Sequence, residues 1–354
     1  MKNVGLLLFL TAFLWSCTEE EAKENTVAEF PETFTVDIPS TLSNSAGLSA
    51  GRVKMNEESV SGNTIYGALR EFIYVGEEAA TVLQKVVTIV GIAHVANVET
   101  FTIESDEDGR SKTFTFNDGV SYDGVNYEHE MIVEDEDGSL ALQVVWNSNP
   151  VSGTAILNPY YINRLEGEDF IDTFYRLDYE ESSDNSKQTM TVTIDGFPNE
   201  DELNKLKMTV VKSGDLYEVF GNSNHLNLEL VNADLAVDRN YAFIARADDA
   251  NDIAVAEVAL PLSTVETADV MDDYSIYTVF DAELKSLGVT DQTVIDAHLT
   301  NAVPPAYFDK ETGFLGAGDD VPSNEAFTSE FIDLSDMSPY VPKDVASLSV
   351  TFLK

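Results

Sequence analysis

The sequence predicts an α+β fold made mainly of an antiparallel β meander, with one long amphipathic helix and a short pair of helices in the C-terminal part. Three observations lead to this prediction. Apolar residues recur every three or four positions between residues 63 and 95, which is typical of an amphipathic helix. From residue 97 onward the apolar period changes to two, and Asp-Gly turns separate the segments. Helical spacing returns at residues 274–287 and again in a short segment that ends at Leu299.

The expected long helix carries its apolar residues on one face. They are Ile65, Leu69, Phe72, Ile73, Ala80, Leu83, Val86, Val87 and Val90. Asn63 or Ser61 can cap the start of this helix, and Gly76, midway along it, predicts a kink or a division into two helices. The opposite face is too polar for a segment that anchors the chain in a membrane.

Short strands joined by tight turns are expected over most of the remaining chain, and one isolated short strand is expected earlier, at residues 33–38. Turns are predicted at residues 106–109, 117–119 and 135–138, because Asp-Gly between alternating segments is a strong hairpin signal. Later strand pairs are predicted at 174–179 with 190–194, 208–211 with 216–220, and 241–245 with 253–260. Such short connections make neighbouring strands antiparallel. About a dozen sequential strands predict a curved sheet, a half-barrel or a sandwich.

The C-terminal part combines the two expected helices with a long irregular segment. Gly288 is a suitable C-cap for the first helix, and Thr290 or Asp291 can cap the second. Residues 302–344 contain five prolines and six aromatic rings. We interpret this segment as a strap that covers a sheet edge or a barrel mouth, in preference to a lid or a binding loop. Residues 346–353 are predicted to form a final strand of the sheet.

Five aromatic residues are candidate ligand contacts, since exposed rings often form platforms for sugars and other ligands. Trp146 ends an apolar strand, a position that more often belongs to a core. Tyr160 and Tyr161 are adjacent, so only one of them could face a ligand if the pair lies on a strand. Tyr307 and Phe314 belong to the irregular segment.

No catalytic residue, cofactor site or metal site is predicted. The string Gly47-Leu48-Ser49-Ala50-Gly51 matches the serine-hydrolase pattern, but it lacks the preceding buried strand that the nucleophile elbow requires. The Asp-rich turns lack the glutamate at position twelve of an EF-hand loop, which leaves only weak surface binding of Ca²⁺ as an expectation. The four histidines, His94, His129, His225 and His298, show no metal-ligand spacing.

The charge of the chain restricts its partners. A formal net charge of −43 repels phosphates and anionic headgroups, so nucleic acid is excluded as a partner. With 44% hydrophobic residues the chain can bury a core, and its single cysteine rules out a disulfide within the chain.

The first residues have the form of a secretory signal. Lys2 precedes the twelve-residue stretch from Val4 to Trp15, which is apolar except for Gly5 and Thr11 and is shorter than the ~20 residues of a membrane-spanning helix. Leu14-Trp15-Ser16-Cys17 resembles the lipobox of bacterial lipoproteins. That resemblance implies cleavage before Cys17 and a diacylglycerol on its sulfur. Two or more acyl chains anchor a protein stably to a membrane.

An acidic run, Glu19-Glu20-Glu21, follows this cysteine and looks like the export signal of surface lipoproteins in the Bacteroidota. The resemblance implies display on the outer face of the outer membrane, and the periplasmic face is the alternative. We therefore expect a signal peptide at residues 1–16, a lipidated tether at 17–58 and a β-rich globular region at 59–354, with a sub-boundary near 198–206.

These observations favour a non-enzymatic envelope lipoprotein that binds a small molecule, a glycan or a protein. A surface hydrolase or glycan-capture accessory protein is one alternative, and a structural or adhesive component is another. The combination of a long helix with a β meander looks broadly like the half-barrels that hold lipids or other ligands in bacterial envelopes.

Replacing Cys17 with serine should abolish lipidation. Cells grown with a clickable palmitate should label the parent protein and leave C17S unlabelled, because serine offers no thiol for thioether formation. Equal labelling of both proteins, or a mature product without lipid, would contradict the anchor.

Overall fold

A computed structural model describes residues 34–43, 53–54, 62–94, 100–106, 108–197, 204–224, 228–229 and 238–354. Cys17, the Gly47–Gly51 string and His225 lie outside the described residues.

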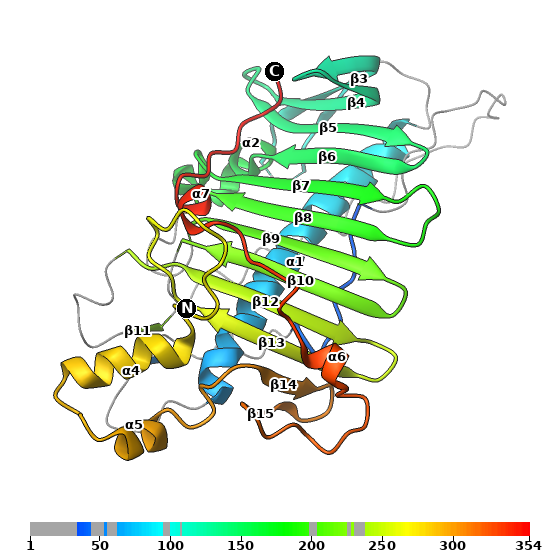
Figure 1. Cartoon of the computed structure of the whole chain (residues 1–354). Coiled ribbons are helices and arrows are strands. Elements are labelled where there is room, and N and C mark those ends of the chain that lie inside the picture. Colours follow the sequence, from blue (N-terminus) through cyan, green and yellow to red (C-terminus); the bar gives the residue numbers. More distant parts are fainter. Residues whose placement is uncertain are drawn as a thin grey trace.

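The predicted antiparallel meander is confirmed as a single open sheet of 13 strands (Figure 1). Strand order is β15-β14-β13-β12-β10-β9-β8-β7-β6-β5-β4-β3-β2, so strands that follow one another in this sheet are also neighbours in space. The strands are β2 Thr100–Glu104, β3 Ser111–Tyr122, β4 Val125–Asp135, β5 Leu140–Ser148, β6 Val151–Leu157, β7 Phe174–Glu181, β8 Gln188–Asp195, β9 Leu206–Ser213, β10 Leu216–Ser223, β12 Tyr241–Asp248, β13 Ile253–Ala259, β14 Ala306–Asp309 and β15 Gly313–Ala317. Separately, β1 Val53–Lys54 pairs in parallel with β11 Leu228–Glu229.

One predicted hairpin turn is wrong. Residues 117–119 lie inside β3, where Asn117 pairs with Glu130 and Asp118 with His129 of β4. The chain reverses later, at Asp123 and Gly124, whose φ angles are 51° and 82°. Two successive residues with positive φ form the tight turn that suits a two-residue hairpin. Of the two Asp-Gly pairs, the second therefore makes the turn.

Helix α1, Gly62–His94, crosses one face of the sheet behind the strands in Figure 1. It is continuous through Gly76, so the expected division into two helices is wrong. A Cβ at Gly76 would lie 2.4 Å from Cε of Met208 in β9, and this residue therefore lets the helix approach the sheet closely. None of the described helices is long and apolar enough to cross a membrane.

The other helices are short and lie in the connections. They are α2 Pro159–Ile162, the 3₁₀ turns η3 Arg164–Glu166 and η4 Glu168–Phe170, α4 Ile276–Ser286, α5 Gln292–His298, α6 Ser329–Ile332 and α7 Pro342–Ala346. Side chains of Ser275 and Asp291 cap the first turns of α4 and α5 by accepting hydrogen bonds from backbone N–H groups.

The main core lies between α1 and the sheet. Residues 34–43 complete it: Phe34, Val36 and Ile38 are buried, and the Phe34 ring lies 5.9 Å from the ring of Tyr179. These alternating side chains led to the expectation of a short strand, but the segment is irregular. Residues 34–43 lie on the face of the sheet. The backbone groups of the strands there already pair with one another, so the segment does not add a strand.

The irregular segment predicted at 302–344 is partly wrong, because β14 and β15 form a hairpin there that extends the sheet. Residues 318–354, which follow this hairpin, are called the C-terminal strap below. The strap crosses the face opposite α1 (Figure 1). Its first half packs Phe327, Phe331 and Leu334 on the sheet residues Ile244 and Val255.

Gly153 sets how closely Phe34 can approach the sheet, and this gives a stability prediction. A Cβ at Gly153 would lie 2.4 Å from the Val145 carbonyl oxygen and 2.7 Å from the Phe34 ring. Gly153→Ala should therefore lower the free energy of unfolding by about 1–3 kcal/mol in urea titrations.

Gly67→Ala is the matched control. No neighbouring atom lies within 4 Å of a Cβ at Gly67 in α1. The substitution should raise stability by about 0.5–1 kcal/mol through helix propensity. Equal effects of the two substitutions would contradict the packing described here.

Candidate functional site

The face of the sheet away from α1 is polar over its central strands. Register places the outward side chains in two rows across β7, β8 and β9. Asp178 pairs with Thr191, which pairs with Thr209. Arg176 pairs with Thr193, which pairs with Lys207. Side chains on a strand alternate between faces, so these polar residues share the face that the C-terminal strap crosses.

Side chains of the sheet hold the middle of the strap in place. Asn222 Nδ2 donates to the Tyr340 carbonyl oxygen at 3.0 Å, and Asn240 Nδ2 donates to the Pro342 carbonyl oxygen at 3.0 Å. Asn240 Nδ2 also donates to Asn222 Oδ1 at 2.8 Å. Both asparagines are fully buried. A buried amide that loses its partner costs about 1–3 kcal/mol, so these bonds fix the path of the strap.

The end of the strap is held in the same way. The backbone N–H groups of Val350 and Leu353 donate to Asp195 Oδ2 and Gln143 Oε1, each at 2.8 Å. The Phe352 ring meets the Phe174 ring edge-on at 5.5 Å. Residues 346–353 therefore do not form the predicted final strand. Ala346 ends helix α7, and residues 348–353 then cross the strands of the sheet and bond to their side chains.

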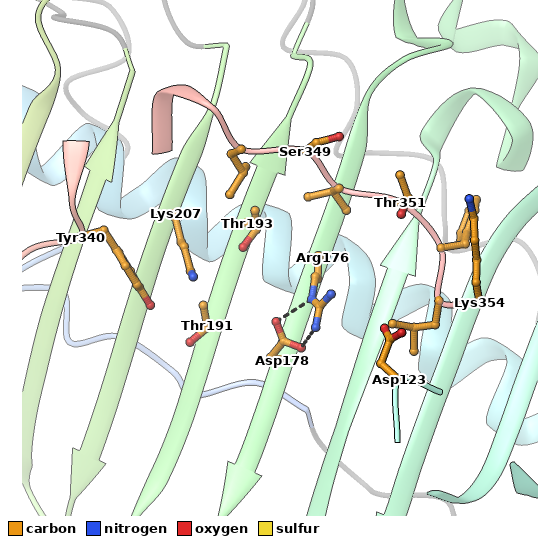
Figure 2. A pocket seen from close by; sticks show the side chains of 14 residues that line it. Asp123, Arg176, Asp178, Thr191, Thr193, Lys207, Tyr340, Ser349, Thr351 and Lys354 are labelled. Carbon is orange, nitrogen blue, oxygen red and sulfur yellow. Dashed lines mark hydrogen bonds and ion pairs between the residues drawn. The ribbon is translucent and has the colours of Figure 1, made fainter. Parts of the chain in front are cut away.

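A groove of about 490 Å³ lies between the strap and the polar face (Figure 2). Its floor is formed by Arg176, Asp178, Thr191, Thr193 and Lys207. Its walls are formed by Tyr340 and residues 348–354 of the strap, together with Asp123 from the β3–β4 turn. This groove is the candidate functional site.

Two of the cations that line the groove, Arg176 and Lys207, have different partners. Arg176 donates two hydrogen bonds to Asp178, at 2.8 and 2.7 Å, and these bonds raise the pKa of Arg176. Lys207 places its Nζ 4.4 Å from the centroid of the Tyr340 ring. Within the described part of the chain, no carboxylate lies within ion-pair distance of Lys207, so its ammonium faces the groove and an aromatic ring.

Three hydroxyl groups beside Lys207 are linked by hydrogen bonds. Thr191 Oγ1 lies 2.6 Å from Thr209 Oγ1, which lies 2.5 Å from the Tyr340 hydroxyl. A hydroxyl donates one hydrogen and can accept two. Three hydroxyls joined by two bonds therefore keep one hydrogen that neither bond uses, at Thr191, Thr209 or Tyr340. At Thr191 or Tyr340, which line the groove, it can be donated to a ligand.

Four of the five candidate aromatic residues make contacts within the protein, away from the groove. Trp146 is 1% exposed on the α1 face and lies 5.1 Å from the His129 ring. Tyr307 is also 1% exposed, and its hydroxyl donates to the Gly318 carbonyl oxygen. Tyr160 and Tyr161 lie on α2, not on a strand, and both rings cover the Arg164 guanidinium, at 4.6 and 4.7 Å.

The fifth candidate, Phe314, stacks on Tyr66 at 5.6 Å and packs against Phe308 at 5.8 Å. Phe314 thus closes the core at the β15 end of the sheet.

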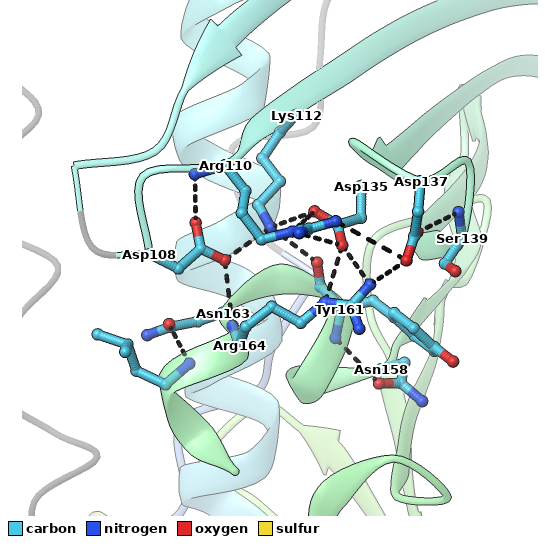
Figure 3. A network of polar contacts seen from close by, with 11 residues as sticks. Asp108, Arg110, Lys112, Asp135, Asp137, Ser139, Asn158, Tyr161, Asn163 and Arg164 are labelled. Atoms are coloured by element: carbon cyan, nitrogen blue, oxygen red, sulfur yellow. Dashed lines mark hydrogen bonds and ion pairs between the residues drawn. The ribbon is translucent and has the colours of Figure 1, made fainter. Parts of the chain in front are cut away.

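Arg164 belongs to an ion cluster that joins three connections of the meander (Figure 3). The cluster holds Asp108, Asp135 and Asp137 together with Arg110, Lys112 and Arg164. Asp135 has a fully buried side chain and accepts from Arg110 at 2.9 Å, from Lys112 at 2.8 Å and from Arg164. Three acidic and three basic side chains balance one another, so the cluster serves as a structural tie.

The cluster also bears on the expected binding of Ca²⁺. Asp108, Asp135 and Asp137 come from the Asp-rich turns, and each is engaged by at least one cation of the protein. Among the described residues, no group of three or more His, Cys, Asp or Glu side chains is arranged to hold a metal ion. Weak binding at the exposed turns stays a prediction.

Comparisons with protein-family models, with curated proteins and with solved structures found no match.

The residues of the groove were missed by the sequence analysis. Arg176 with Asp178, Thr191 with Thr193, and Lys207 with Thr209 are polar pairs at a spacing of two within otherwise apolar strands. This pattern predicts a polar sheet face. Thr209 and Tyr340, whose hydroxyls are in contact, are 131 residues apart in the sequence. No local pattern indicates a contact between residues so far apart.

Asp135→Asn should destabilise the fold by about 3 kcal/mol at neutral pH, because the cations around it would lose a buried partner. Burial alone would raise the pKa of Asp135, but hydrogen bonds from Arg110, Lys112 and Arg164 outweigh it and hold this pKa well below its usual range. The carboxylate therefore stabilises the fold fully above the unfolded-state pKa of 3.8, and this contribution is lost as the pH falls below it.

Urea titrations at neutral and acid pH check this prediction. D135N should lose less stability on acidification than the parent. D137N, at the half-exposed rim of the cluster, is the control and should have a much smaller effect at neutral pH. Parallel pH profiles of the parent and D135N would contradict the role of Asp135.

Proposed function

We propose that this chain is a lipid-anchored envelope protein that binds a polar, hydroxyl-rich ligand, such as a glycan, in the groove under the C-terminal strap. The anchor part of the proposal depends on the lipobox-like residues that end at Cys17 and on the acidic run behind them. Outer-membrane surface display follows from the same residues, and the periplasmic face is the alternative. The binding part depends on the groove.

The chemistry of the groove is the observation that supports binding of a polar ligand. Its floor presents a guanidinium, a carboxylate, an ammonium and two hydroxyl groups within one space. A sugar hydroxyl both donates and accepts, so donors and acceptors side by side suit carbohydrate better than they suit a lipid tail. Tyr340 adds a ring at the wall of the groove.

The α1 side of the sheet offers less support for a ligand. Side chains of α1, of residues 34–43 and of the strands form one continuous buried cluster there. A hollow of about 340 Å³ does lie beside α1, but polar and charged side chains such as Ser43, Arg70 and Glu77 line it. A carrier of lipid in the manner of a half-barrel is therefore not the function we propose.

Binding without chemistry is favoured by the state of the carboxylates in the groove. A hydrolase of the two-carboxylate type needs one acid and one base free to reach the substrate. Both oxygens of Asp178 accept hydrogen bonds from Arg176, and the other carboxylate of the groove, Asp123, is exposed on a hairpin turn. Both features support binding rather than hydrolysis.

Thr191→Phe tests the proposal, because it fills the floor of the groove with a residue that strands accommodate well. Affinity electrophoresis of the full-length protein through gels that contain neutral or acidic polysaccharides should show retardation of the parent. T191F should weaken binding by about tenfold or more, equivalent to about 1.4 kcal/mol.

Thr102→Phe is the matched control, since Thr102 lies on the edge strand β2, far along the sheet order from the groove. T102F should bind as the parent does. Parental mobility of T191F, or no retardation of the parent by any polysaccharide tested, would overturn the proposal.

A further inference from the structure

Lys207 differs from three other cations on its face of the sheet, each of which lies close to a carboxylate. Arg176 pairs with Asp178, Lys205 lies 3.5 Å from Asp195, and Arg246 pairs with Glu218 and Asp336. The cross-strand neighbours of Lys207 are Thr193 and Asn222, both uncharged. In a chain with 63 acidic residues, an ammonium in a cavity without a described acidic partner is available to an anion from solution.

The groove also differs in charge from the chain as a whole. Three basic side chains line it, Arg176, Lys207 and Lys354, against two acidic ones, Asp123 and Asp178. The complete chain has 20 basic and 63 acidic residues. The lining of the groove is therefore close to balanced in charge within a strongly negative molecule. This local difference makes the groove less repulsive to an anionic group on a ligand than the rest of the surface.

Two neighbouring features complete a subsite for an anion. Nζ of Lys207 is held over the Tyr340 ring, which is fixed in turn by the bond from Asn222 to the Tyr340 carbonyl. The linked hydroxyls of Thr191, Thr209 and Tyr340 keep one hydrogen to donate, as described above. A lysine and a hydroxyl donor side by side can bind the two oxygens of one carboxylate, and such charge-assisted bonds are the stronger kind.

We infer that Lys207 and its neighbouring hydroxyls bind the carboxylate of an acidic sugar, a uronic acid or a sugar of the same charge. This inference rests on the proposed function and adds the class of glycan. The Arg176–Asp178 pair, Thr193 and the strap backbone then contact the neutral hydroxyls of the chain of sugars.

A peptide is the less suitable occupant. Extended peptides gain affinity by adding a strand to an exposed sheet edge. The groove lies instead on the face of the central strands β7, β8 and β9. Their backbone groups already pair with one another and with β6 and β10. A ligand in the groove therefore contacts side chains of the sheet and the strap, and finds no unpaired strand backbone to which a peptide could add.

Titration calorimetry with two matched probes tests the inference. The probes are a trimer of galacturonic acid and a neutral trimer of galactose, each titrated into the full-length protein. The parent should bind the acidic trimer about tenfold more tightly, a charge-assisted difference of about 1.4 kcal/mol. Lys207→Met should abolish this preference, because the carboxylate loses its cation and the acidic trimer should then bind no more tightly than the neutral one. Lys207→Arg, which keeps the charge, should retain the preference.

Lys212→Met is the control. Lys212 lies on the same strand and over a tyrosine ring, that of Tyr217 at 5.2 Å, but it points to the opposite face of the sheet. K212M should keep the preference for the acidic trimer. Circular dichroism melts of all variants confirm that they fold.

Three outcomes would overturn the inference. The first is equal affinity of the parent for both trimers, and the second is an equal loss of affinity for both trimers in K207M. Either result would contradict a preference for acidic sugars and leave the proposed glycan binding intact. Binding of neither trimer by the parent would contradict both the inference and the choice of glycan as ligand.

Discussion

The packing of one long helix on one face of a 13-stranded sheet determines the rest of this structure. Helix α1 and residues 34–43 bury the apolar side of the strands in a single core. Because α1 and residues 34–43 pack on one face only, the opposite face is covered by a different segment. The C-terminal strap covers it with apolar residues over β12 and β13 and with polar contacts farther along. In this sheet, with one side filled and the other crossed by the strap, the groove lies under the strap.

The polar half of that face differs from the usual solvent-facing side of an antiparallel sheet. Its side chains are enclosed by the strap, and they are joined to each other and to Tyr340. Enclosure strengthens hydrogen bonds and ionic contacts because water is partly displaced. The balanced cluster around Asp135 uses such contacts to tie connections together, whereas the Lys207 ammonium in the groove has no acidic partner among the described residues. That difference separates the structural network from the candidate site.

The sequence alone predicted much of the fold and little of the site, for physical reasons. Alternation and turn residues are local signals, so the hairpins at 208–220 and 241–260 were correct. Residues 34–38 and 346–353 alternate in the same way but lie across a sheet face, because alternation reports burial and not pairing. Asp118-Gly119 and Asp123-Gly124 look alike locally, and only pairing with β4 distinguishes them. Lys207 and Tyr340 meet through the path of the strap, which no local pattern encodes.

Hydrogen exchange of the full-length protein, with and without a galacturonic acid trimer, tests the central claim most directly. The proposed ligand lies between the strap and strands β7 to β9. Backbone amides of Val350 and Leu353, which bond to Asp195 and Gln143, should exchange more slowly when the trimer is bound. Unchanged exchange at these amides, with protection gained only at the sheet edges or along α1, would contradict the account.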